Sequence, residues 1–465
     1  MSKRTAGTTS RYADPTRAPE LGPPGSWSFP TPRHARLDNG IDVVVHQLPG
    51  QYVITAHLIV DTPLNAEPRA LEGVATICAR ALDEGSVAHP GAEFAELLET
   101  EGASFGVDVS LAGFQTILDV PVTRLEPALH LFAEAMTRPA FARGDVDRHV
   151  QLRLAQIEQA RANSAQTAAI AFRNAVFAPE GRAARMTGGE AETVAEVDAA
   201  AVRTFYDQAI GPRGTTLVLA GDFPTDPVPA AAAALGRWTN DAQQTVAYVP
   251  PAAAGRRARI IDRPGSVQSD LRLGGFGIDR ADPRWADLTV ASYAMGGAFL
   301  SRLNAVLREE RGYTYGVQLQ STPQRSGGSF AVQGSFRSEV TVAALQEALQ
   351  LLRVDGCPFT EVEVQQAQTY FAGVSPLRYA TADGVADQAA TQRLLRLPED
   401  YVDANLAALD AVTPESATAA YRSLVDVDAL TLVLVGDASV LAEPVRALGF
   451  GDLEVVGRRP GPEQD

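Results

Sequence analysis

An internal duplication is the feature of this sequence that most restricts its fold. The segment "TTLVLAGD" (Thr215–Asp222) recurs as "LTLVLVGD" (Leu430–Asp437), and each reads as a buried strand closed by a Gly-Asp turn. At the same offset of 215 positions, Tyr206 aligns with Tyr421. A second match, of "LLETEGASFGV" with "LREERGYTYGV", aligns a glycine and the aromatic residue three positions after it. The chain therefore reads as two copies of one unit.

Each copy mixes strands of alternating or continuous apolar character with amphipathic helices. We expect an α+β class with two homologous mixed α/β-roll (ferredoxin-like) domains in tandem. The expected N-terminal domain covers residues 31–240 and the expected C-terminal domain covers residues 258–458. A stretch rich in Ala, Pro and Gly, residues 241–257, reads as the linker. Residues 1–30 and 459–465 read as disordered tails.

Composition excludes several functional classes. The formal net charge of −16 disfavours nucleic-acid binding, which needs concentrated positive charge. The only lysine is Lys3, so neither a P-loop nor a pyridoxal Schiff base can be built. The chain has no apolar run of the roughly eighteen residues that a membrane-spanning helix requires, and no secretory signal pattern. We therefore expect a cytoplasmic protein without a membrane partner.

Cys78 and Cys357 have no cysteine neighbours with which to form a zinc ribbon or a redox pair. We expect both to be structural. The pattern "GASFG" around Ser104 matches the GxSxG of a serine hydrolase, but that motif needs a strand before the serine and a helix after it. The expected order is the reverse. Ser104 is therefore not expected to be a nucleophile.

The second copy carries the motifs that resemble a known family. The runs "DRPGSVQSDLRLGGFGI" and "ASYAMGGAFLSRLNAVLREERGYTYGVQLQS" closely resemble the C-terminal domain of the pitrilysin (insulinase, mitochondrial processing peptidase) family of inverzincin metallopeptidases. The resemblance covers roughly residues 35–455. It implies two similar domains per chain, which form half of a clam-shell peptidase chamber. It also implies an HxxEH zinc motif with a later glutamate ligand in one domain, and an Arg/Tyr pair from a different domain.

The zinc motif is degenerate in this chain. The corresponding helix is "EGVATICARALDEGS", in which the two histidines become Thr76 and Arg80 and the catalytic glutamate becomes Ala79. The later ligand falls near Gln156, with Glu158 two residues away. All six histidines lie in the first half, and none belongs to an HxxEH or HExxH motif. A threonine, an amide and a cation are poor zinc ligands, so we expect no zinc or other cofactor in this chain.

Arg308 and Tyr315, seven residues apart, match the Arg/Tyr pair of the family. In the alternative without function, Arg308 pairs with Glu309 or a neighbouring helix, and Tyr315 packs as a strand residue. By resemblance, Gly296, Gly297 and Phe299 in "MGGAFLSRL" lie where the non-catalytic subunit of the processing peptidase has a glycine-rich substrate loop. The alternative is a tight turn that lets the helix pack closely.

These residues lead to three hypotheses. In the first, the chain is the zinc-free subunit of a bacterial-type heterodimer, and it supplies Arg308 and Tyr315 to a peptide held by an HxxEH-bearing homologue. In the second, it is an inert scaffold or peptide-binding pseudoenzyme of the same fold. In the third, which we favour least, it is a self-sufficient hydrolase with relocated ligands.

Overall fold

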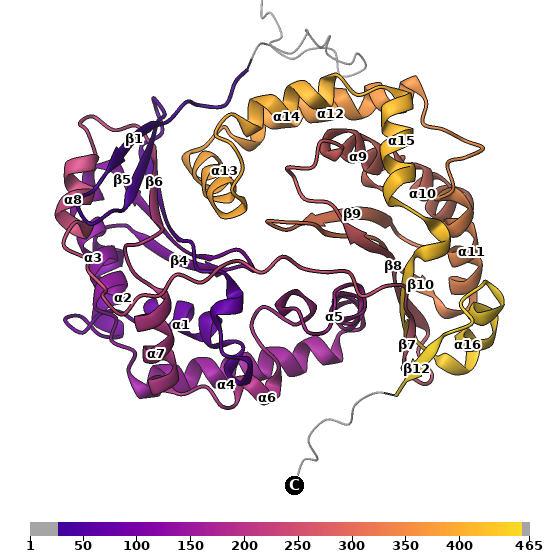
Figure 1. Cartoon of the computed structure of the whole chain (residues 1–465), viewed down its shortest axis with the longest axis horizontal. Helices are drawn as coiled ribbons and strands as arrows, with labels where there is room; N and C mark the ends of the chain where they lie inside the picture. The colour runs from indigo at the N-terminus through magenta and orange to yellow at the C-terminus, as the bar shows by residue number, and fades with distance from the viewer. Residues whose placement is uncertain (1–26, 458–465) are drawn as a thin grey trace, which may run out of the picture.

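The computed structural model describes residues 27–457 and contains two six-stranded mixed sheets (Figure 1). The strand order is β1-β2-β6-β3-β5-β4 in the first sheet and β12-β7-β11-β8-β10-β9 in the second. The first sheet consists of β1 (Arg33–Arg36), β2 (Asp42–Gln47), β3 (Val53–Val60), β4 (Ser104–Val109), β5 (Phe114–Pro121) and β6 (Thr215–Gly221). The second consists of β7 (Ala258–Asp262), β8 (Gln268–Gly277), β9 (Val317–Pro323), β10 (Gly328–Arg337), β11 (Thr431–Gly436) and β12 (Glu454–Val456).

Apart from one edge, the two sheets repeat each other strand for strand. Strands β2, β6, β3, β5 and β4 correspond to β7, β11, β8, β10 and β9. In each set the first pair is parallel and the others are antiparallel. The duplicated "TTLVLAGD" and "LTLVLVGD" segments supply β6 and β11, which occupy the same place. The differing edge strands are β1, antiparallel to β2, and β12, parallel to β7. The expected α+β class and its duplication are confirmed.

Helices surround the sheets. Those of the first half are α1 (Val74–Leu82), α2 (Ala92–Thr100), α3 (Leu125–Thr137), α4 (Arg143–Ala162), α5 (Ser164–Val176), α6 (Ala191–Val194), α7 (Ala199–Ala209) and α8 (Val228–Leu235). Those of the second half are α9 (Trp285–Ser292), α10 (Arg302–Asn304), α11 (Thr341–Leu351), α12 (Glu361–Arg378), α13 (Ala382–Leu395), α14 (Tyr401–Asp410), α15 (Pro414–Leu424) and α16 (Ala438–Ala447). Two π-helical segments, η5 (Tyr293–Gly297) and η6 (Ala305–Glu310), flank α10. Short 3₁₀ turns are η1 (Leu64–Ala66), η2 (Arg69–Leu71), η3 (Val122–Arg124), η4 (Arg182–Ala184), η7 (Ser338–Val340) and η8 (Val427–Ala429).

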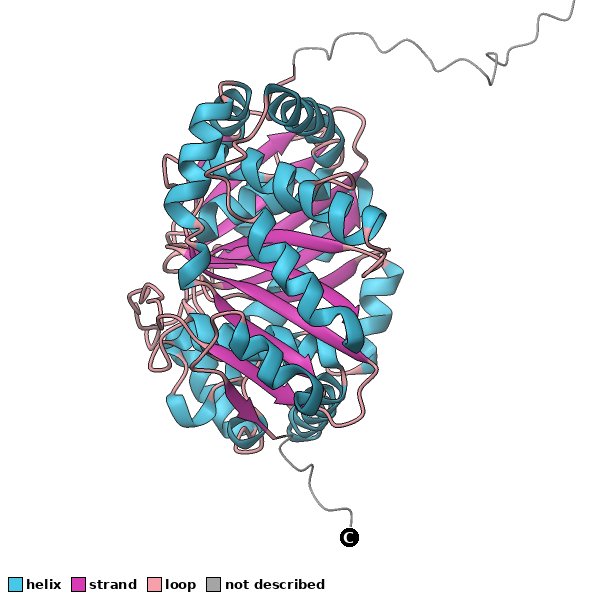
Figure 2. Ribbon diagram, turned by 90° about the vertical axis from the view of Figure 1, so that its right-hand side faces the viewer, coloured by secondary structure: helices cyan, strands magenta, loops and turns pink. Residues whose placement is uncertain are grey.

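The two halves exchange one helix each. Helix α5 of the first half packs against β8 and β11, and α13 of the second half packs against β3 and β6 (Figure 1). Phe172 and Val176 of α5 are buried against Val433 of β11, and Val385 of α13 is buried with Val218 of β6. Further helices of the second half lie over its sheet (Figure 2). Since each half completes the other's core, the halves form one packed unit.

A buried arginine adds a polar link between the halves. Arg325, in the turn between β9 and β10, donates from Nη2 to Oδ1 of Asp61 at 2.6 Å and to the Ala112 carbonyl at 2.7 Å. Its Nε donates to the Leu394 carbonyl at 2.7 Å. Burial raises the pKa of Asp61, but hydrogen bonds from Arg396 and Arg325 outweigh this effect and lower the pKa overall. The carboxylate of Asp61 is thus stabilised by two arginines of the other half.

Several segments differ from the sequence-based expectations. The helical segment that comprises α4 and α5 is broken at Asn163, whose side chain caps α5 by accepting from the Gln166 amide at 2.9 Å. Residues 241–257 contain no helix or regular strand, and we retain them as the proposed domain boundary. Of the expected tails, residues 1–26 and 459–465 lie outside the described part of the chain, as does residue 458 of the expected C-terminal domain. Residues 27–30 are described, and Phe29 is buried with its ring 5.2 Å from that of Tyr379.

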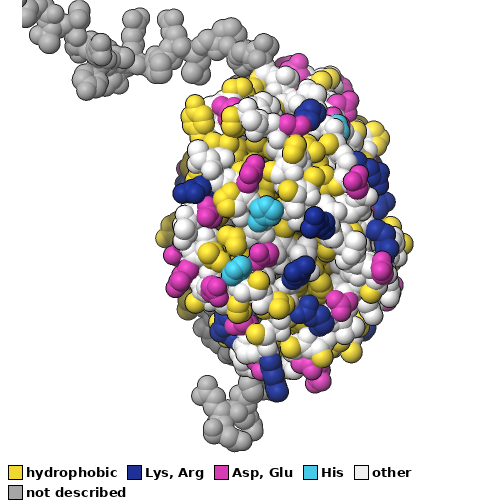
Figure 3. Space-filling model, turned by 90° about the vertical axis from the view of Figure 1, so that its left-hand side faces the viewer, with side chains coloured by type: hydrophobic (Ala, Val, Ile, Leu, Met, Phe, Trp, Pro, Cys, Tyr) yellow, Lys and Arg dark blue, Asp and Glu magenta, His cyan; other side chains and the backbone are white. Residues whose placement is uncertain are grey.

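The two cysteines differ in their exposure. Cys78 is buried in α1, and burial raises the pKa of its thiol, whereas Cys357 is exposed. Ser104 opens β4 after α2, the order opposite to that of a hydrolase elbow. No helix within residues 27–457 is long and apolar enough to cross a bilayer. On the face shown in Figure 3, basic side chains are interspersed with acidic and hydrophobic ones.

Candidate functional site

The positions that correspond to a zinc motif lie on two packed helices. Thr76, Ala79 and Arg80 lie on α1, and Gln156 lies on α4. Nη1 of Arg80 donates a hydrogen bond to Oε1 of Gln156 at 3.0 Å. Two of the positions that the resemblance assigns to metal ligands are therefore side by side in this chain and bonded directly to each other.

The side chains at these positions do not suit a zinc ion. Ala79 is buried and has no ligand atom, and the guanidinium of Arg80 is a cation that repels metal ions. Burial and, secondly, the charge of Arg80 lower the pKa of Arg153 on α4, so Arg80 lies near a second cation. Glu158 pairs with Arg161 at 2.7 Å. Over residues 27–457, no three His, Cys, Asp or Glu side chains are grouped to hold a metal.

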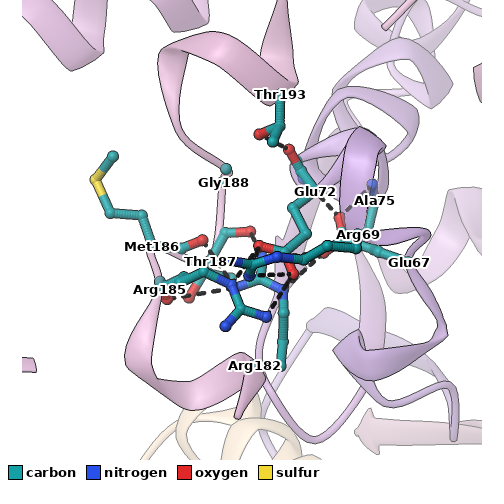
Figure 4. Close-up of polar contacts among 12 residues, drawn as sticks. Glu67, Arg69, Glu72, Ala75, Arg182, Arg185, Met186, Thr187, Gly188 and Thr193 are labelled. Atoms are coloured by element: carbon teal, nitrogen blue, oxygen red, sulfur yellow. Dashed lines mark hydrogen bonds and ion pairs between the residues drawn. The ribbon is translucent and has the colours of Figure 1, made fainter. Parts of the chain in front are cut away.

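A buried ion pair fixes the start of α1 (Figure 4). The side chain of Glu67 is fully buried, and its Oε2 accepts from Nε and Nη2 of Arg182 at 3.0 and 2.9 Å. Its Oε1 accepts from the amides of Gly73 and Ala75 at 2.9 and 3.0 Å. Burial raises the pKa of Glu67, and the charge of Arg182 opposes that rise. The helix N-terminus is thereby held by a carboxylate.

A second pair extends this network. Glu72 accepts from Nε and Nη2 of Arg185 at 2.7 and 2.6 Å (Figure 4). Directly after Glu72, Gly73 has φ = 105°, and a Cβ there would lie 2.8 Å from the carbonyl oxygen of Gly188. A glycine is thus needed both for the backbone conformation and for the close approach of the loop. This network was not predicted from the sequence.

Arg308 and Tyr315 lie in one open groove of the second half. It has a volume of about 800 Å³, and Gly297 and Phe299 also line it. Thr76, Ala79, Arg80 and Gln156 do not line it. The polar side chains of its floor come from β8, β9 and β10 and are Gln268, Asp270, Arg272, Gln318, Gln333 and Ser335. The uncovered part of the second sheet therefore offers a hydrogen-bonding surface beside the Arg/Tyr pair.

The local fold presents both members of the pair to the groove. Arg308 lies on η6, and its guanidinium stacks over the ring of Phe299 with 4.0 Å to the centroid. Its Nε lies 3.5 Å from Oε1 of Glu309. A turn at Gly312, where φ is 63°, leads to Tyr315 just before β9, and this tyrosine is 99% exposed. Tyr315 is thus not packed as a strand residue. Arg308 contacts an aromatic ring as well as Glu309, its partner in the alternative without function.

The two glycines of "MGGAF" differ in their environments. A Cβ at Gly296 would lie 2.5 Å from the backbone nitrogen of Leu319, so the absence of a side chain lets η5 pack against β9. A Cβ at Gly297 would have no neighbouring heavy atom closer than 3.4 Å, and Gly297 lines the groove. Gly296 therefore fits the close-packing alternative, and only Gly297 has access to a ligand in the groove.

A hydroxyl–carboxylate pair recurs at the same place in both sheets. In the groove, Ser335 on β10 donates to Asp270 on β8, and these residues face each other in register. In the first sheet, Thr55 on β3 donates to Asp119 on β5 at 2.6 Å, again in register. In the second sheet the acid lies on β8 and the hydroxyl on β10. In the first sheet the hydroxyl lies on β3, which corresponds to β8, and the acid lies on β5, which corresponds to β10. Since neither short motif is shared, the sequence repeats did not reveal this correspondence.

Comparisons with known proteins agree with this architecture. The family model described as "Insulinase (Peptidase family M16)" matches residues 42–186, and "Peptidase M16 inactive domain" matches residues 196–371. An uncharacterized zinc protease of Streptomyces coelicolor is 23% identical over 91% of this chain and 94% of its own. The non-peptidase homolog YmxG of Helicobacter pylori is 21% identical over 78% of this chain and 84% of its own.

Solved structures give the same result. The peptidase M16 inactive domain from Pseudomonas fluorescens superposes with a TM-score of 0.80 at 25% identity, covering 87% of this chain and 98% of that one. A protease from Helicobacter pylori has the same fold, with a TM-score of 0.79 at 15% identity over 88% of this chain and all of that one. The chain therefore belongs to peptidase family M16, the insulinase family, as a member whose sequence lacks the HxxEH motif.

Proposed function

We propose that this chain is the zinc-free subunit of a heteromeric M16 peptidase and supplies Arg308 and Tyr315 to a substrate peptide bound at a partner's HxxEH site. The observation that carries the proposal is the contrast between the groove of the second half and the degenerate zinc-motif positions of the first half. The groove keeps both hydrogen-bond donors open to a ligand, while Arg80 and Gln156 bond to each other where metal ligands would lie. The proposed complex is a cytoplasmic heterodimer that acts on peptides.

The chemistry assigned to this chain is hydrogen-bond donation. The hydroxyl of Tyr315 and the guanidinium of Arg308 donate to the carbonyl of the scissile bond and to the negative charge that develops on its oxygen. The glutamines on the groove floor bind the neighbouring backbone of the peptide. The homologous partner supplies the metal and the general base, which this chain cannot provide.

The test is reconstitution with an HxxEH-bearing homologue encoded by the same genome. We expect a quenched-fluorescent peptide library to be cleaved by the mixture faster than by either chain alone. Arg308→Ala and Tyr315→Phe should each lower kcat by about 10²-fold without dissociating the complex, as the loss of one oxyanion donor typically does. The matched controls are Arg311→Ala, which breaks only a surface pair with Glu347, and Tyr52→Phe, at an exposed tyrosine of the first half.

An inert scaffold of the same fold is the alternative function. The Helicobacter relative named as a non-peptidase homolog gives this reading its support. A scaffold would form the complex and tolerate Arg308→Ala and Tyr315→Phe with peptidase activity intact. That result would refute the catalytic proposal while leaving the assembly in place.

A further inference from the structure

Asn304 connects the three segments that build the groove around the Arg/Tyr pair. This residue ends α10 and is 7% exposed. Its Nδ2 donates to the carbonyl of Val317 at 2.9 Å, and its Oδ1 accepts from the amide of Val317 at 3.0 Å. Nδ2 also lies 3.2 Å from both the Ala298 carbonyl and Oγ of Ser301. One amide group therefore links the Phe299 loop, the helix and the first residue of β9.

The two hydrogen bonds between the Asn304 side chain and the backbone of Val317 resemble those between neighbouring β-strands. β9 is an edge strand, paired through Val317 with Gly334 of β10 on one side only. On its open side, both backbone groups of Val317 bond to the Asn304 side chain, which replaces a neighbouring strand at this position. Val317 is almost fully buried, so its amide and carbonyl would be costly to leave unpaired.

The positions of Arg308 and Tyr315 follow from this link. Arg308 lies about one turn beyond Asn304 on the continuing helix, and Tyr315 precedes Val317 by two residues. Tyr315 is 99% exposed, so the anchored backbone on either side of its side chain places it. The anchor on the other side is Thr314, whose Oγ1 donates to the Ser335 carbonyl at 2.9 Å.

We infer that Asn304 is a positioning residue, which sets the spacing of the Arg308 guanidinium and the Tyr315 hydroxyl by pairing with the backbone of Val317. Its effect on turnover rests on the proposed function, whereas its effect on the Tyr315 segment does not. Aspartate at position 304 has nearly the same shape but keeps only the acceptor. In Asn304→Asp a carboxylate oxygen would face the Val317 carbonyl, the Ala298 carbonyl and Oγ of Ser301, the three oxygens that accept hydrogen bonds from Nδ2 of Asn304. A displacement of about 1 Å in a catalytic group can cost up to about 10²-fold in rate.

The first measurement uses the isolated chain and needs no partner. Hydrogen exchange should be faster in Asn304→Asp than in the unmodified chain across residues 312–317, including the amide of Val317. The matched control is Asn240→Asp. Asn240 also bridges backbone groups, through Nδ2 to the carbonyls of Asp207 and Ile210 at 2.8 and 2.7 Å, but in the first half. This control should leave exchange at residues 312–317 unchanged. Unchanged exchange there in Asn304→Asp would overturn the inference.

The second measurement uses the reconstituted complex and a cleaved quenched-fluorescent peptide. We expect Asn304→Asp to lower kcat by about 10-fold or more while KM changes little, because the groove floor that binds peptide is intact. Asn240→Asp should leave kcat unchanged even if it lowers stability. If Arg308→Ala lowers kcat and Asn304→Asp does not, the positioning inference fails and the proposed function stands. If neither changes kcat while the exchange effect is present, the proposed function fails and the structural role of Asn304 stands.

Discussion

Arg182→Ala removes the cation that pairs with the buried carboxylate of Glu67. The side chains of this pair are 7% and 0% exposed, and the guanidinium donates two hydrogen bonds to the carboxylate. Breaking a buried pair from one side typically costs about 3–5 kcal/mol, because it leaves an uncompensated buried charge. Since Gly73 and Ala75 still donate to Glu67, we expect the lower end of that range, about 3 kcal/mol.

Urea unfolding, followed by both circular dichroism and tryptophan fluorescence, measures this loss and checks that the two probes report one transition. The loss should shrink as the pH falls, because protonation removes the buried charge of Glu67. The control is Arg69→Ala. Its side chain is 66% exposed and contacts Glu72 at 3.2 Å, so its removal should cost less than about 1 kcal/mol. An equally small effect for Arg182→Ala would refute the reasoning.

Three further predictions concern single residues. Asp61→Asn should lower stability at neutral pH. Because the folded-state pKa of Asp61 is lowered, the stabilisation that the carboxylate provides is present above its unfolded pKa and is lost as the pH falls through the folded one; unfolding curves from neutral to acidic pH measure this. Gly296→Ala should cost about 1–3 kcal/mol because its Cβ meets the backbone of β9, and Gly297→Ala should cost less, as thermal unfolding will show. A thiol reagent should modify Cys357 in the folded chain and reach Cys78 only after unfolding, as mass spectrometry will detect.

The sequence was sufficient for the duplicated architecture and for the two repeated buried strands, β6 and β11. Both follow from local patterns, an apolar strand with a Gly-Asp turn, repeated at a fixed offset. The exchange of α5 and α13 between the sheets was not predictable in this way. The apolar faces of these helices show that they pack, but not which sheet they pack against.

The candidate site, too, was predictable from the sequence only in part. Arg308 and Tyr315 were proposed because they and the motifs around them resemble those of the family, and the turn at Gly312 between them is encoded locally. The roles of Asn304 and of the Glu67–Arg182 pair depend on partners that are distant along the chain or on bonds to backbone atoms, which leave no pattern in side-chain identity. Asp270 and Ser335 were missed for the same reason.

Titration of this chain into a fixed amount of its HxxEH-bearing homologue, with the initial rate of peptide cleavage as readout, tests the central claim most directly. The account predicts a rate that rises to a plateau with the unmodified chain, and a plateau about 10²-fold lower with Tyr315→Phe. A rate that does not depend on this chain, or equal plateaus for the two proteins, would contradict it.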